Sequence, residues 1–61
     1  MKEDLTGNQI VIVGFARQGR AFARFAAENG AKVIVSDLGS QEQLRKSMQE
    51  LHDLDIEYVL G

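Results

Sequence analysis

The chain has 61 residues, no cysteine, one histidine and a formal net charge of −2 at pH 7. This length allows one small domain, and the composition excludes a disulfide framework or a thiolate metal site. The charge gives no electrostatic footprint for nucleic acid or an anionic membrane. The longest strongly apolar run, residues 10–13, is far too short to cross a bilayer, and we expect a cytoplasmic protein.

The first half of the chain predicts a strand and a helix. Residues 10–13 are β-branched and uncharged, which is typical of a strand buried on both faces in a parallel sheet. From about residue 18 to 29 the apolar positions return at helical spacing, with alanines that offer a slim side to a sheet. We expect Phe22 and Phe25 in the core. Gly30 suits the left-handed position that ends a helix.

The second half repeats this pattern. Residues 31–36 predict a second buried strand that ends at Asp37. Ser40 and Gln43 have the spacing of a capping box, and a second amphipathic helix follows to about residue 51. Residues 56–60 predict a third strand near an edge. The alternation predicts one α/β domain over residues 1–61, a Rossmann-like three-stranded parallel sheet in βαβαβ order, half of a doubly wound fold with spatial order 3-2-1.

A glycine loop lies between the first predicted strand and helix. It is a variant of G-x-G-x-x-G in the context that the motif requires. The first glycine lets the chain turn, the small middle residue lets amides approach a diphosphate, and the last glycine lets the helix pack closely on the sheet. The alternative is a plain strand-to-helix turn. The residues predicted to bind a diphosphate are Gly14, Phe15, Ala16, Arg17, Gln18 and Gly19.

Four charged or titratable residues are further candidates. Asp37 ends the second strand, where dinucleotide folds place an acid that accepts hydrogen bonds from a ribose; the alternative is a turn acid. Arg17 and Arg20 flank the loop and could pair with phosphate, although a solvated cation is favoured for Arg20. His52 is interpreted as a surface residue at a helix end. No nucleophile lies beside a base, so the sequence predicts no catalytic residue and no metal site.

Residues 5–19 resemble the opening of the Mur ligases of peptidoglycan synthesis, which serve cell shape and cell division, and above all the members that add D-glutamate. Residues 23–25, 29–33, 35–37 and 55–61 extend the resemblance over nearly the whole chain. It implies a truncated first domain that binds a UDP-linked muramoyl substrate. The loop would hold the diphosphate, and Asp37 with Leu38 would meet the uracil end. ATP and Mg²⁺ would act in later domains. Family loops often carry serine or threonine where this chain has Gln18, whose amide could donate instead.

Two other functions remain open from the residues alone. Asp37 would also suit the ribose diol of NAD, in a dehydrogenase or a ligand-sensing regulator. The chain could instead bind nothing and serve as an assembly unit. In a complete fold of order 3-2-1-4 the first strand pairs on both sides, and here its fourth-strand neighbour is missing. Because residues 10–13 carry no charge or proline to block an open edge, we expect a homodimer in which two such edges pair antiparallel.

Overall fold

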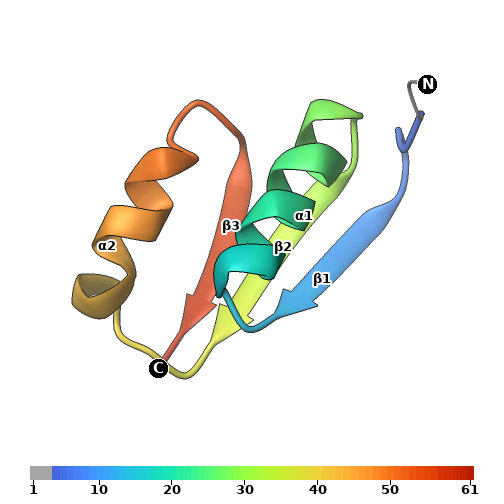
Figure 1. The fold of residues 1–61 in the computed structure, drawn as a ribbon. Helices are drawn as coiled ribbons and strands as arrows, with labels where there is room; N and C mark the ends of the chain where they lie inside the picture. The colour runs from blue at the N-terminus through green and yellow to red at the C-terminus, as the bar shows by residue number, and fades with distance from the viewer. Residues whose placement is uncertain (1–3) are drawn as a thin grey trace.

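A computed structural model describes residues 4–61 of the chain. Its elements are β1 (Gln9–Val13), α1 (Arg17–Glu28), β2 (Lys32–Asp37), α2 (Gln41–Glu50) and β3 (Ile56–Leu60). The strands form a parallel sheet in the order β1-β2-β3, and Figure 1 shows their arrowheads at one end of the molecule. The predicted α/β, Rossmann-like arrangement is confirmed, and β3 lies at an edge as expected.

The register brings the loops after β1 and β2 together. Ile10 lies beside Val33, and Val33 lies beside Ile56, so each strand is level with the next. The carboxyl ends of parallel strands therefore meet at one edge of the sheet, which is where open α/β sheets bind ligands.

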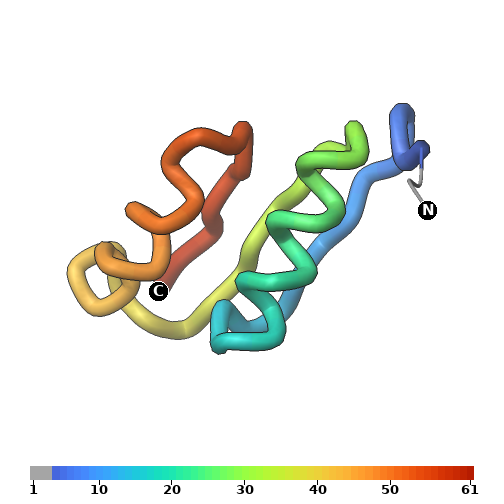
Figure 2. The backbone as a smooth tube through the Cα atoms, turned by 45° about the horizontal axis from the view of Figure 1, so that its top comes forward, coloured from blue at the N-terminus to red at the C-terminus, as the bar shows by residue number. Residues whose placement is uncertain are grey.

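Both helices cover the same face of the sheet, as Figures 1 and 2 show from two directions. Side chains alternate between the faces of a strand, and those that turn toward the helices form the core. The buried residues are Ile12, Phe15, Ala23, Ala26, Ala31, Val33, Val35 and Leu51.

The opposite face of the sheet, called here the open face, is uncovered by the described residues. It exposes Val11, Val13 and Val59, with 84% of Val13 accessible. The prediction that the first strand is buried on both faces is therefore wrong. Both crossovers step in the same direction from β1 to β3, and right-handed crossovers in one direction place both helices on one side.

Alanines form the inner side of α1. Ala23 and Ala26 are fully buried, whereas Phe22 and Phe25 are 48% and 41% exposed. The two phenylalanine rings stack on each other with centroids 6.3 Å apart. The prediction of a core role for these rings is thus wrong, since α1 lies too close to the sheet for a large side chain between them.

The predicted helix ends are confirmed. Gly30 follows α1 with φ of +97°, the left-handed conformation that favours glycine. At the start of α2, the Ser40 side chain accepts a hydrogen bond from the Gln43 N–H, and the Gln43 side chain accepts one from the Ser40 N–H. Neither helix in residues 4–61 has the length and apolarity that crossing a membrane requires.

Candidate ligand-binding site

The glycine loop turns sharply from β1 into α1. Gly14 has φ of +92°, and its N–H donates to the Ser36 carbonyl at 2.7 Å, the last bond between β1 and β2. Ala16 is the N-cap of α1, and its side chain makes no capping hydrogen bond. The first bond of the helix runs from the Arg20 N–H to the Ala16 carbonyl. The amides of the first helical turn have no partner within a helix, so they are suited to an anion.

Gly19 sets the distance between the loop and the helix. A Cβ atom at this position would overlap the Gly14 carbonyl oxygen and would also contact the Ile12 side chain at 3.4 Å. Only a residue without a side chain lets α1 begin so close to the end of β1. The packing therefore agrees with the reason expected from the sequence, which is that this glycine lets the helix lie close to the sheet.

Phe15 anchors the loop in the core. Its side chain is 2% exposed and meets the Tyr58 ring edge-on, with centroids 5.5 Å apart. Its N–H donates to the Asp37 carboxylate at 2.7 Å. Phe15 was predicted as one of the diphosphate-binding residues, but neither its ring nor its N–H faces outward. The outward part of the loop is the segment from Ala16 to Gly19.

Asp37 joins the two loops at the carboxyl end of the sheet. One carboxylate oxygen accepts the Phe15 N–H and the other accepts the Gly39 N–H, each at 2.7 Å. These hydrogen bonds, the one from Phe15 above all, hold the pKa of Asp37 below its usual value. The carboxylate thus fills the structural role of a turn acid. Each oxygen keeps lone-pair capacity for a further donor such as a ribose hydroxyl.

A hollow of about 280 Å³ lies beside this carboxylate, lined by Val13, Gly14, Ser36, Asp37 and Leu38. Leu38 is 94% exposed at its rim. Apolar walls with a few polar groups, here Ser36 and Asp37, are the usual lining of a small-molecule site. Sequence analysis assigned no role to Val13 or Ser36. The signal was available, because Val13 ends β1 and Ser36 is the last residue but one of β2, at the carboxyl edge where ligands of such sheets bind.

A larger hollow of about 570 Å³ lies between α2 and the end of β3. It is lined by residues outside the glycine loop and does not include Asp37. Size alone would favour it, but the smaller hollow has the acid, the loop glycine and the sheet edge typical of nucleotide folds. We therefore take the smaller hollow as the candidate site.

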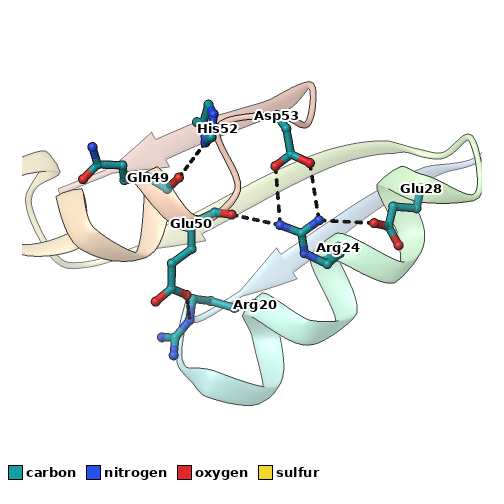
Figure 3. Close-up of polar contacts among 7 residues, drawn as sticks. All are labelled: Arg20, Arg24, Glu28, Gln49, Glu50, His52 and Asp53. Carbon is teal, nitrogen blue, oxygen red and sulfur yellow. Dashed lines mark hydrogen bonds and ion pairs between the residues drawn. The ribbon is translucent and has the colours of Figure 1, made fainter.

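The arginines after the loop mostly serve to join the helices (Figure 3). Arg20 forms an ion pair with Glu50 at 3.3 Å and donates to the Ser47 hydroxyl at 3.2 Å. It therefore turns toward α2 rather than toward the loop. Arg17 lies at the first position of α1 and lines the groove between the helices together with Arg20.

Arg24 makes the most extensive of these contacts. Its guanidinium donates to the Glu50 carbonyl at 2.9 Å, to both oxygens of Asp53 at 3.4 Å, and to Glu28 at 3.2 Å. The bond from Arg24 is the main cause of a lowered pKa at Asp53. His52 lies just after α2, with Nδ1 3.0 Å from the Gln49 carbonyl, as expected for a surface residue at a helix end.

A parallel βαβαβ sheet, with a glycine loop after its first strand and an acid at the end of its second, defines a Rossmann-like domain. Comparison with known proteins then shows what the chain is similar to. The chain is 47% identical to the UDP-N-acetylmuramoylalanine–D-glutamate ligase of Geotalea uraniireducens over 58 residues, which is 95% of this chain and 13% of that protein. It is 46% identical to the same ligase of Geobacter metallireducens over 93% of this chain and 13% of that protein.

The predicted resemblance to the Mur ligases is confirmed by these relatives. A more distant example, from Clostridioides difficile, is 36% identical over 95% of this chain. The chain spans about 13% of the length of the curated relatives that it matches. No protein-family model matches the chain, and no solved structure matches it.

Proposed function

We propose that this chain binds the UDP part of a UDP-linked muramoyl substrate of peptidoglycan synthesis and has no catalytic activity of its own. The observation that carries the proposal is the arrangement of the uncapped start of α1 beside the hollow at Val13, Ser36 and Leu38. The start of α1 favours an anion such as a diphosphate, and the hollow favours a flat, weakly polar ring. The similarity to ligases whose names include a UDP-sugar supports this pairing.

In this proposal the diphosphate meets the amides of Arg17, Gln18 and Gly19, and the uracil end meets Leu38. Asp37 accepts a hydrogen bond from the nucleoside with the lone pairs that Phe15 and Gly39 leave free. The Gln18 side chain is exposed and donates its amide where related loops use a hydroxyl.

In this proposal the ligase chemistry belongs to parts of the relatives that this chain does not match. ATP and Mg²⁺ are implied for the longer proteins. Within residues 4–61, no group of three or more histidine or acidic side chains gathers that could hold a metal ion. The described residues therefore do not supply the ligands of a Mg²⁺ centre.

The alternative ligand is NAD, because an acid at the end of the second strand also suits a ribose diol. Titrations of ¹⁵N-labelled chain with UDP, uridine, UDP-N-acetylmuramoyl-alanine and NAD distinguish the two. We expect UDP to shift the amides of residues 16–19 and of Leu38. Uridine should shift Leu38 and leave residues 16–19 nearly unchanged, because it lacks the diphosphate.

Three outcomes would count against the proposal. Tighter binding of NAD than of either UDP compound would favour the dehydrogenase or regulator alternative. No shift at millimolar UDP would favour an assembly unit. Shifts confined to the larger hollow near Tyr58 would place the site elsewhere.

A further inference from the structure

Phe15 is the residue that attaches the glycine loop to the core. Among residues 14–19, all of which the structure describes, it is the only one with a buried side chain. Residues 16–18, which follow it directly, are exposed and belong to the segment proposed to meet the diphosphate. Because the backbone joins these residues to Phe15, the position of their amides depends on how Phe15 is held.

Phe15 is held through its backbone and through its ring. Its N–H donates to the Asp37 carboxylate at 2.7 Å, a bond that fixes the peptide group but does not determine the side-chain rotamer. The ring meets the Tyr58 ring edge-on, with centroids 5.5 Å apart and planes at 70°. Edge-to-face is one of the two geometries that aromatic pairs prefer. Tyr58 therefore fixes the orientation of Phe15 that the backbone bond leaves open.

Tyr58 lies on the strand of the sheet that is furthest from β1. β2 lies between β1 and β3 (Figure 1), and Ile12, Val35 and Tyr58 are level across the three strands. Neighbouring strands lie about 4.8 Å apart, so β1 and β3 are roughly 10 Å apart. Two large side chains are needed to span that distance on the face that the helices cover. A contact between Phe15 and Tyr58 thus connects the loop after β1 to β3.

We propose that Tyr58 is a positioning residue for the diphosphate part of the candidate site: its ring holds Phe15, and Phe15 holds the amides of residues 16–19 in place for an anion. Tyr58 does not line the hollow beside Asp37 and acts only through the Phe15 ring. This role rests on the proposed function, because the loop must bind a diphosphate for its position to matter. The uracil end at Leu38 does not depend on the ring contact, since Leu38 follows β2 and is exposed.

The test separates the Tyr58 ring from its hydroxyl and from general stability. Tyr58→Phe keeps the ring, Tyr58→Leu removes it, and Ile56→Ala is the matched control. Ile56 packs against the core from the same strand, but it is level with Val33, at the end of the sheet away from the loop. Urea unfolding gives the stability of each variant, and NMR titration gives its affinity for UDP and for uridine.

The expected result is a split between the two ligands. Tyr58→Leu should weaken UDP binding about five-fold, the change in an equilibrium that corresponds to one aromatic pair. Its uridine affinity should change little, because uridine lacks the diphosphate. Tyr58→Phe should bind both ligands as the unmodified chain does, and Ile56→Ala should lose stability but keep its UDP affinity. If Tyr58→Leu does not fold, Tyr58→Met replaces it, since methionine fills irregular space without a ring.

Amide hydrogen exchange without ligand tests the contact independently of binding. The Phe15 amide should exchange faster in Tyr58→Leu than in Tyr58→Phe, relative to the amide of Ile34 in the central strand. If the unmodified chain binds no UDP, the proposed function fails. If it binds UDP and Tyr58→Leu binds it equally well, only the role of Tyr58 fails. Equal losses for UDP and uridine, or for Tyr58→Leu and Ile56→Ala, would also overturn that role, because they would reflect stability alone.

Discussion

The Asp37 carboxylate accepts the backbone N–H of Phe15 across 2.7 Å, although the two residues are 22 positions apart in the chain. This bond fixes the start of the glycine loop to the end of the neighbouring strand. The same carboxylate also accepts the Gly39 N–H. The residue that we propose to meet the nucleoside is therefore also part of the framework that shapes the candidate site.

The first prediction concerns Asp37 and pH. Its pKa is lowered in the folded chain, chiefly by the Phe15 N–H. The stability that this provides is present above the unfolded pKa, about 3.9, and is lost as pH falls through the lower folded pKa. Asp37→Asn should lower the urea midpoint at pH 7 and should flatten its decline below pH 4.

The control for this change is Asp55→Asn, which removes the same charge from an exposed residue before β3. With Asp55→Asn, the decline of the urea midpoint below pH 4 should stay close to that of the unmodified chain. If both variants change the profile equally, the effect reflects net charge rather than the hydrogen bonds of Asp37.

The second prediction concerns the close approach of α1 to β1. Gly19→Ala introduces a Cβ that overlaps the Gly14 carbonyl, and we expect a loss of about 1–3 kcal/mol in the free energy of unfolding. Alanine is otherwise the better helix former by about 1 kcal/mol, so the sign of the result is diagnostic. Gln18→Ala, at an exposed position of the same turn, should be neutral or slightly stabilising. A more stable Gly19→Ala chain would contradict the packing described for the loop.

The third prediction concerns the apolar rim of the candidate site. Leu38 is 94% exposed, so Leu38→Ala should leave the unfolding midpoint nearly unchanged. If the uracil end packs on this side chain, UDP binding should weaken by about five-fold, which corresponds to burial of part of a leucine. Phe22→Ala removes another exposed apolar side chain on α1, away from the hollow, and should not affect UDP affinity. Identical affinities of all three chains would remove Leu38 from the site.

The fourth prediction concerns Tyr58. Its hydroxyl is buried and has no hydrogen-bond partner in residues 4–61, and burial raises its pKa. Tyr58→Phe should therefore stabilise the chain by about 1 kcal/mol, because a buried unpaired hydroxyl is costly. A raised tyrosine pKa also means that stability falls as pH rises above the unfolded pKa of about 10. Thermal unfolding between pH 7 and pH 11 should show that decline in the unmodified chain and less of it in Tyr58→Phe. A less stable variant at pH 7 would mean that the hydroxyl forms a bond that the structure lacks.

Local chemistry explains why so much of the fold could be predicted. The Ser40–Gln43 capping box and the left-handed Gly30 depend on residues within one turn, and both were predicted from their spacing. The strands were recognisable because β-branched runs of this length have few alternatives. The order of the elements then fixed a parallel sheet through the rules of crossover handedness.

Long-range packing explains what the sequence did not reveal. The periodicity of α1 is satisfied equally by Phe22 with Phe25 or by Ala23 with Ala26 on the inner side. The separation of helix and sheet decides between them, and that separation is set at Gly19. Likewise, nothing local to Phe15 indicates that Asp37 accepts its N–H, because the bond depends on the register of β1 and β2.

The order of the strands in the sheet, which is the same as their order in the chain, affects how the chain folds. Ile10 pairs with Val33 and Val33 with Ile56, so each strand joins the one made immediately before it, and within residues 4–61 no strand is inserted between earlier ones. During synthesis, β1, α1 and β2 can form a closed unit before β3 exists. β3 then pairs with β2, which is already part of the sheet. Each connection between two paired strands contains a single helix. The chain can thus fold in the order of its synthesis. The hydrogen bond from the Phe15 N–H to the Asp37 carboxylate then forms when β2 pairs with β1.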